Sequence, residues 1–314
     1  MAKGKANGAI LYSISRGKNA DALAVKQLAS IASFKSGYTA VAPTSVGGTT
    51  YCLAYDKASG NVDVYRFSAK PPWLSLAAAK PSIGAGHDLI ESITIGNLPY
   101  LMAYAKAKGI FQFFAIAPDL SFSKPYVHFD NHGPPVTRGY TTVKPFDYFG
   151  KVGLLAYNGS NGAVATYNVA VTAASTGHVP PLQQRALWSH RWAKGWTRFA
   201  LFQFGSVNFF LKTNTWKPNV NIDHIMSNPE DGTAEVATHL KLADAQKLDL
   251  VEPFALPGGQ PYFATYMKKG GSLTCNRIHP DCKGWTQVAS MNAKSGASQM
   301  VPLSVGGKNY LLMA

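Results

Sequence analysis

The sequence contains few charged residues, and acidic residues are the scarcer kind. Asp and Glu number 16 against 30 Lys and Arg, and the four types together make up only 15% of the 314 residues. Hydrophobic residues make up 46% and aromatic residues 12%, a composition that excludes a disordered chain. The formal net charge of +14 predicts attraction to anionic partners.

Cysteine and long hydrophobic runs are scarce as well. The three cysteines, Cys52, Cys275 and Cys282, are too few for a fold built on disulfides. No hydrophobic run reaches the length of a bilayer span, and the start MAKGKANG lacks the apolar core of a secretion signal. We therefore expect no membrane span and no signal peptide, and the sequence leaves the cellular compartment and the oligomeric state open.

Linear catalytic motifs are missing. The sequence contains no GxSxG, no P-loop, no HExxH and no paired CxxC. In the segment HFDNHG, His128, Asp130 and His132 alternate, so an extended strand would place three possible metal ligands on one side. The neighbouring Asn, Gly and Pro residues favour a loop there instead, and we predict neither a metal nor a cofactor.

What the sequence does contain is an internal repeat. A phrase such as GYTAVAPTSVGGTTYCLAY begins at Gly37 and returns five times, at intervals of 49, 53, 56, 52 and 49 residues. Intervals of this length are typical of propeller blades. The copies start at Gly37, Gly86, Gly139, Gly195, Lys247 and Gly296.

Each copy has the pattern of four strands. In the first copy, alternating apolar residues predict strands at 39–46, 51–55 and 62–67, and WLSLAAA supplies a looser fourth strand. The sixth copy stops at Ala314 without its third strand, which residues 6–14 (ANGAILYSI) match. We predict an all-β, six-bladed β-propeller of one domain over 1–314, with blades of about 52 residues. The N-terminal strand would complete the last blade and remove its open edge.

The repeat resembles those of propeller lectins and related repeat proteins over the whole chain. The resemblance lies in the organisation of the blades. It implies a lectin-like repeat protein whose loops hold a ligand.

The residue after the start of each copy differs between blades. We expect these residues at the mouth of a central channel, where aromatic rings on one side would stack on a sugar or another flat ligand. The alternative is that the rings only plug the channel. In order, the residues are Tyr38, His87, Tyr140, Trp196, Leu248 and Ala297.

The following residue is small and polar in every copy. Its oxygen can accept a hydrogen bond from a nearby backbone N–H, so we predict a structural role in the turn. The six residues are Thr39, Asp88, Thr141, Thr197, Asp249 and Ser298.

Two further features concern charge. We expect two ion pairs between adjacent blades, Glu91 with Lys144 and Arg198 with Glu252. The alternative is that the carboxylates of Glu91 and Glu252 bind a cation or exchange a proton with a substrate. The loops between the second and third strands (B–C loops) carry lysines that would attract an anionic ligand or surface, or are simply solvated hairpin tips. These lysines are Lys3, Lys5, Lys57, Lys106, Lys108, Lys217, Lys268 and Lys269.

The features together favour a lectin-like, carbohydrate-binding propeller that holds a glycan or other small, anionic ligand in one asymmetric pocket. Its predicted ligand-binding residues are Tyr38, His87, Glu91, Tyr140, Trp196, Arg198 and Glu252. The alternative is an enzyme (hydrolase, lyase or cyclase) with candidate catalytic residues His87, Asp88, Tyr140, Lys144, Arg198 and Glu252. A second alternative is a basic scaffold that binds nucleic acid or protein through the lysines of the B–C loops.

Overall fold

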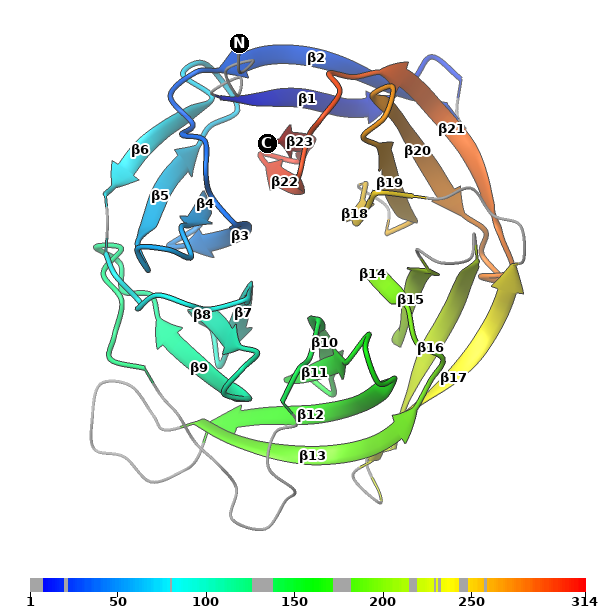
Figure 1. The fold of residues 1–314 in the computed structure, drawn as a ribbon. Helices are drawn as coiled ribbons and strands as arrows, with labels where there is room; N and C mark the ends of the chain where they lie inside the picture. Colours follow the sequence, from blue (N-terminus) through cyan, green and yellow to red (C-terminus); the bar gives the residue numbers. More distant parts are fainter. Residues whose placement is uncertain are drawn as a thin grey trace. The chain divides into compact units, whose positions relative to one another are not determined.

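The structure is a computed structural model of the 314-residue chain. It describes residues 8–19, 22–79, 81–125, 138–171, 182–214, 219–228, 230, 233–242, 248–256 and 259–314. These residues form 23 β-strands (Figure 1). None of them belongs to a helix long and apolar enough to cross a membrane.

The strands form six antiparallel sheets. In the described residues, five sheets have four strands and one has three. Within each sheet the strands pair in the order of an up-and-down blade, which is the building unit of propellers. The chain is therefore a six-bladed β-propeller, as the repeat predicts, and we number blades 1 to 6 in the order of the repeat copies.

The chain divides into two compact units, and the first consists of Met1–Asp56, Asn61–Lys80 and Leu248–Ala314. It holds blades 1, 5 and 6. Blade 1 contains β3 (Ala40–Val46), β4 (Thr49–Tyr55), β5 (Val62–Phe67) and β6 (Leu74–Ala78). Blade 5 contains β18 (Leu250–Ala255), β19 (Pro261–Met267), β20 (Ser272–Ile278) and β21 (Trp285–Asn292), and blade 6 contains β22 (Met300–Val305), β23 (Lys308–Met313), β1 (Ala9–Arg16) and β2 (Leu23–Ile31).

The second unit consists of Lys57–Gly60 and Pro81–Lys247. Blade 2 contains β7 (Leu89–Ile95), β8 (Leu98–Ala105) and β9 (Ile110–Ala115). Blade 3 contains β10 (Thr142–Tyr148), β11 (Lys151–Tyr157), β12 (Ala163–Val171) and β13 (Leu182–Arg191), and blade 4 contains β14 (Trp196–Phe204), β15 (Val207–Asn214), β16 (Val220–Asn228) and β17 (Thr233–Leu242). That the whole chain is one domain stays a prediction.

The two ends of the chain share blade 6. Strand β1 pairs with β23 from Ile10↔Met313 to Ile14↔Asn309, and its other edge pairs with β2 (Figure 1). The predicted N-terminal strand is thus confirmed in the third position of the blade. Because β1 covers the edge of β23, no backbone row of β23 is left open to solvent.

The repeated glycine has a conformational cause. Gly37, Gly86, Gly139, Gly195 and Gly296 all have φ between 89° and 100°. This region is strained for a residue with a Cβ, so the turn into each innermost strand selects glycine.

The cores lie between neighbouring blades. In the first unit, one cluster of buried side chains joins blades 5 and 6, and another joins blades 6 and 1. In the second unit, the clusters join blades 2 and 3, and blades 3 and 4. Alternate residues of each strand point into these layers, which explains the apolar alternation of the repeat.

We predict that blade 6 cannot form without the inward face of β1. Replacing Leu11, which is fully buried, by Asp should lower the free energy of unfolding by more than about 3 kcal/mol, because an apolar side chain is lost and an unpaired charge is buried. Ser15→Asp places the same group on an exposed position of the same strand and serves as the control. Thermal unfolding followed by circular dichroism compares them, and equal melting temperatures would contradict the placement of β1.

Candidate functional site

The small polar residue at the second position holds a B–C loop in place in three copies. Asp88 Oδ2 accepts a hydrogen bond from the backbone N–H of Lys106 at 2.7 Å. Thr141 Oγ1 accepts one from Gly159 at 3.0 Å, and Asp249 Oδ2 accepts one from Lys268 at 2.8 Å. The predicted structural role is confirmed at these three positions, which explains their uniformity.

Asp88 also forms an ion pair with Lys57, at 2.6 Å. Burial raises the pKa of the Asp88 carboxyl, but the hydrogen bonds from Lys57 and from the Lys106 backbone outweigh burial and bring the pKa below its ordinary value. Asp88 is therefore an ionised loop anchor, and one of the B–C loop lysines is neutralised by it.

The aromatic or His residue at the first position of three copies packs on the third strand of its own blade. Its partner follows 27 residues later: the hydroxyls of Tyr38 and Tyr65 are 2.8 Å apart, and those of Tyr140 and Tyr167 are 2.7 Å apart. The rings of His87 and Phe114 lie 6.3 Å apart. This spacing is the sequence signal for these pairs.

This packing differs from the expectation that these side chains lie open at the mouth of a central channel. His87, Tyr140 and Trp196 are only 5%, 1% and 6% exposed, because their blades offer them partners inside the core. In the structure these three side chains are packing residues, and their contact with a ligand stays a prediction. Tyr38 is half-buried, and it lies in the first unit.

Trp196 packs around a buried lysine. The Lys212 ammonium lies 3.9 Å from the centre of the Trp192 ring and 4.7 Å from that of Trp196, and it pairs with Asp223. Burial lowers the pKa of Lys212, and the attraction of Asp223 opposes this shift. The Trp rings and the Asp223 carboxylate together stabilise the Lys212 ammonium, whose burial would otherwise raise the free energy of the folded protein.

The predicted ion pair between blades 2 and 3 is present. Lys144 Nζ and Glu91 Oε1 are 2.7 Å apart, and each side chain is about a quarter exposed. Arg198 lies in the second unit and Glu252 in the first. The ion pair between Glu91 and Lys144 is confirmed, and a role of either residue toward a ligand or substrate stays a prediction.

Four of the candidate catalytic residues are buried or paired with other residues of the second unit. His87 Nε2 lies 3.2 Å from the Ile83 carbonyl oxygen, to which it donates as the neutral imidazole. Burial lowers the pKa of His87, and this hydrogen bond only partly opposes it. Of the enzyme candidates, His87 and Tyr140 are buried and Asp88 and Lys144 are ion-paired.

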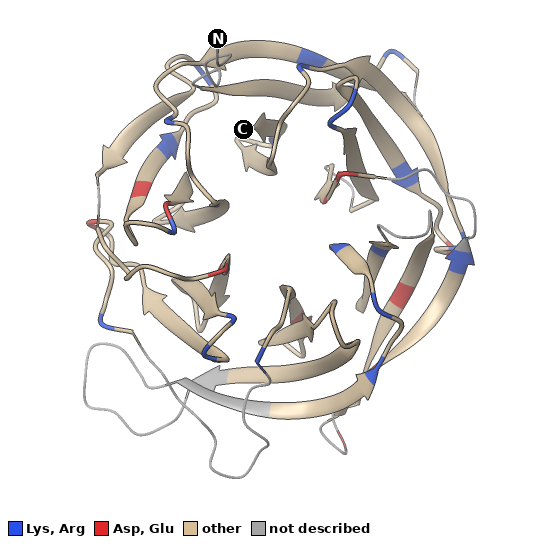
Figure 2. Cartoon of the chain, viewed as in Figure 1, with Lys and Arg blue, Asp and Glu red and all other residues tan. Residues whose placement is uncertain are grey.

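The remaining predictions concern metals, cysteines and lysines. Among the residues that the structure describes, no group of three His, Cys, Asp or Glu side chains is placed to hold a metal ion. All three cysteines are buried and free. Figure 2 shows Lys and Arg on strands and loops of both units. His128, Asp130, His132, Lys3, Lys5 and Lys217 lie outside the described residues.

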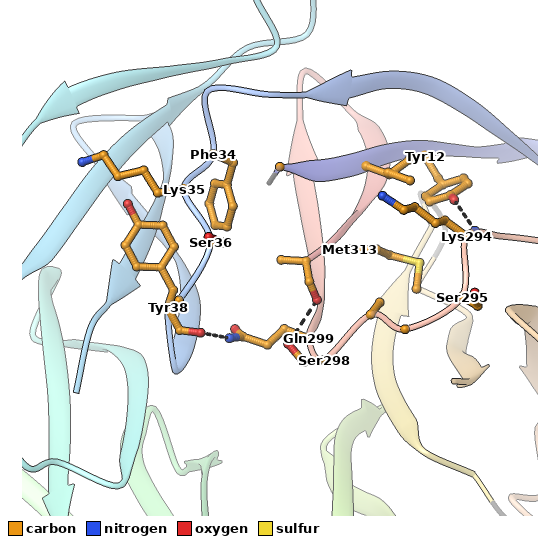
Figure 3. Close-up of a pocket in the computed structure, with 16 residues that line it drawn as sticks. Tyr12, Phe34, Lys35, Ser36, Tyr38, Lys294, Ser295, Ser298, Gln299 and Met313 are labelled. Atoms are coloured by element: carbon orange, nitrogen blue, oxygen red, sulfur yellow. Dashed lines mark hydrogen bonds between the residues drawn. The ribbon is translucent and has the colours of Figure 1, made fainter. Parts of the chain in front are cut away.

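A pocket of about 570 Å³ lies at one end of blade 6, within the first unit (Figure 3). The loops that lead into blades 1 and 6 form its two sides, and Met313 lies between them. We call it the blade 6 pocket. Its lining residues are Gly8, Ile10, Tyr12, Phe34, Lys35, Ser36, Gly37, Tyr38, Lys294, Ser295, Gly296, Ala297, Ser298, Gln299, Met313 and Ala314.

In other blades a tyrosine hydroxyl binds the loop that leads into the next blade. The hydroxyl of Tyr104 accepts a hydrogen bond from the Tyr140 N–H at 3.2 Å, and Tyr157 donates one to the Ala193 carbonyl at 2.6 Å. Tyr266 donates to the Lys294 carbonyl at 2.6 Å and accepts from the Ala297 N–H at 3.2 Å. We call Tyr104, Tyr157 and Tyr266 the inter-blade tyrosines.

Blade 6 departs from this pattern. Each inter-blade tyrosine pairs with the first residue of its innermost strand, and in blade 6 the residue at that register position is Met313, opposite Met300. A methionine has no hydroxyl to bind the loop at 34–38. The pocket lies where that bond would form. In blade 4, Thr213 pairs with Arg198, which aligns with those first residues in the repeat, and in blade 1 Tyr55 pairs with Ala40.

The ring of Tyr38 is held rigidly on one side of the pocket. Its hydroxyl donates to Asp63 Oδ2 at 2.5 Å, and Lys35 Nζ donates to the same oxygen at 2.6 Å. Burial, and then the hydrogen bond to Asp63, raise the pKa of Tyr38 well above its usual value, so it stays a neutral phenol. Gln299 Nε2 donates to the Tyr38 carbonyl at 3.0 Å, which joins the two sides (Figure 3).

Of the predicted ligand-binding residues, the blade 6 pocket contains only Tyr38. Sequence reasoning missed Phe34, Lys294, Gln299 and Met313. The signal that could have found them is the substitution of methionine for the repeated tyrosine at position 313.

No known protein family's sequence model matches the chain, and neither does any curated protein sequence. Solved structures do resemble it. A candidate 6-phosphogluconolactonase from Bacteroides fragilis is 15% identical, with a TM-score of 0.56 over 99% of this chain and 89% of that one. A candidate 6-phosphogluconolactonase from Bacteroides uniformis is 14% identical, with a TM-score of 0.55 over the same shares.

An α-L-arabinofuranosidase from Clostridium thermocellum is 11% identical to the chain. Its TM-score is 0.51, over 80% of this chain and 94% of that one. At such identities the three likenesses show the fold alone, and they agree with the propeller described above.

We predict that Trp196 stabilises blade 4. Trp196→Ala should lower the free energy of unfolding by about 3–5 kcal/mol, because it removes a buried ring and uncovers the Lys212 ammonium. The control, Thr197→Ala, changes an exposed neighbour and should stay within about 0.5 kcal/mol of wild type. Urea denaturation measures both. A Trp196→Ala protein as stable as the control would show that the ring is not a core residue.

We also predict that His87 makes the protein less stable in acid. Its pKa in the folded protein lies below the 6.5 of the unfolded chain, so the folded state binds fewer protons and stability falls as the pH drops through and below 6.5. His87→Gln should reduce the loss of melting temperature between about pH 8 and about pH 5. The exposed His190 offers the control, His190→Gln, which should keep the wild-type loss. If both variants lose as much as wild type, His87 does not drive the effect.

Proposed function

We propose that the protein binds a small carbohydrate in the blade 6 pocket. The observation that supports this most is the fixed, half-buried ring of Tyr38 beside the Gln299 amide in a pocket of about 570 Å³. Sugar rings have an apolar face that stacks on aromatic rings and hydroxyls that need hydrogen-bond partners. A pocket of this size, with a few polar groups among apolar ones, is typical of small-molecule sites.

The polar groups on the second side of the pocket fit the same ligand. The loop before β22 contributes the hydroxyls of Ser295 and Ser298, both exposed, and the Lys294 side chain. The inter-blade tyrosine Tyr266 holds this loop at two points. Because both sides are held by hydrogen bonds, little conformational freedom would be lost when a ligand binds.

The names of the similar structures favour carbohydrate chemistry as well. Two are candidate 6-phosphogluconolactonases and one is an α-L-arabinofuranosidase. They also favour the alternative, an enzyme that hydrolyses a sugar derivative. Incubation with glucono-δ-lactone and with p-nitrophenyl α-L-arabinofuranoside tests it. Turnover above that of a Met313→Tyr variant would favour the enzyme, and binding without turnover favours the lectin-like function.

We predict that restoring the missing tyrosine closes the pocket. In Met313→Tyr the added ring should fill the floor of the pocket, and its hydroxyl should bind the loop at 34–38 as the inter-blade tyrosines bind theirs. Saturation-transfer NMR with glucose, galactose, N-acetylglucosamine, glucuronic acid and glucose 6-phosphate should show binding to wild type and none to this variant. Thermal stability should be kept.

Met226→Tyr is the matched control. It introduces the same ring at an exposed methionine of the second unit, which lies outside the pocket, and should bind the sugars as wild type does. Tyr38→Ala should weaken binding by removing the stacking ring. Wild-type binding by Met313→Tyr, or no binding of any of the five sugars by wild type, would contradict the proposal.

A further inference from the structure

The backbone of Lys294 is fixed on both sides of its Cα. Its N–H donates to the hydroxyl of Tyr12 at 3.4 Å, and its carbonyl accepts from the hydroxyl of Tyr266 at 2.6 Å. Tyr12 belongs to blade 6 and Tyr266 to blade 5, and both are fully buried. Two buried tyrosines therefore set the direction in which the Lys294 side chain leaves the loop.

This direction is into the blade 6 pocket. Figure 3 shows the Lys294 side chain extending past Met313, with its ammonium toward the middle of the pocket. The lining residues Met313 and Ile10 have apolar side chains, which offer the ammonium no hydrogen-bond partner.

The two lysines of the pocket differ in their charge balance. Lys35 is bound to Asp63 at 2.6 Å, and this hydrogen bond raises the pKa of Lys35. No ion pair joins Lys294 to any residue that the structure describes, and no Asp or Glu is among the described residues that line the pocket. The Lys294 ammonium therefore has no ion-pair partner among the described residues, whereas Lys35 has one.

We propose that Lys294 is the specificity-determining residue of the blade 6 pocket and that it selects a sugar with one anionic group, a carboxylate or a phosphate. This rests on the proposed carbohydrate-binding function and narrows it to acidic sugars. The ring of such a ligand lies against Tyr38, and its anionic oxygens accept hydrogen bonds from the Lys294 ammonium. A charge-assisted hydrogen bond of this kind is about twice as strong as a neutral one.

Isothermal titration calorimetry with three probes tests the inference. Glucuronic acid carries a carboxylate, glucose 6-phosphate carries a phosphate, and glucose carries neither. Wild type should bind at least one of the two acids about tenfold or more tightly than glucose, and the preference should shrink as salt is added. Whichever acid is preferred identifies the anionic group.

Lys294→Gln should abolish the preference, so that this variant binds the two acids no more tightly than it binds glucose. Lys294→Arg should retain most of the preference, since the positive charge is kept. The matched control is Lys308→Gln, which removes the same charge from an exposed residue at the opposite end of strand β23 and should bind as wild type does.

The outcomes separate the two proposals. If wild type binds glucose as tightly as both acids, or if Lys294→Gln keeps the preference, the inference about Lys294 is wrong and the carbohydrate-binding function stands. If wild type binds galactose or N-acetylglucosamine but none of the three probes, only the inference is wrong. If it binds none of the five sugars, the proposed function itself is wrong, and the inference falls with it.

Discussion

The structure depends on how a tyrosine hydroxyl of one blade binds the loop that leads into the next. Blades contact one another through apolar side chains, which fix distance but not register, because the hydrophobic effect has no direction. The hydroxyls of Tyr104, Tyr157 and Tyr266 form hydrogen bonds, which are directional and can therefore fix the register. Each also satisfies a backbone group that would lose its water partners inside the fold, and leaving such a group unpaired costs about 1–3 kcal/mol.

The blade 6 pocket lies where this blade lacks the tyrosine hydroxyl. Blade 6 has Met313 at the tyrosine position, so the loop at 34–38 is held instead by Asp63, through Tyr38 and Lys35, and by Gln299. These bonds run along the sides of the pocket and leave its middle open. The pocket thus arises from a change of hydrogen-bond partners, with the β-strands of the blade unchanged.

Much of the fold follows from the sequence, because strand alternation and glycine turns are local properties that repeat. The spacing of the copies predicts six blades, and the likeness of residues 6–14 to a third strand predicts the pairing of β1 with β23. The direction of the residue after each lead glycine does not follow from alternation. It depends on distant partners, Tyr167 for Tyr140 and Lys212 for Trp196, so both are core residues although their position in the repeat favours a channel mouth. The pocket escaped prediction because it depends on the hydroxyl that Met313 lacks.

That the pocket contains a lysine without a carboxylate partner has its origin in the composition. The structure uses carboxylates as partners for lysines: Asp63 binds Lys35, Asp88 binds Lys57, and Glu91 binds Lys144. With 16 acidic against 30 basic residues, such pairing must leave many cations without a carboxylate. Most of these can remain in open water, where a charge is well solvated. Lys294 differs because two buried tyrosines direct its side chain toward a concave site. In the proposed complex, the anionic group of the ligand would replace water as the partner of its ammonium.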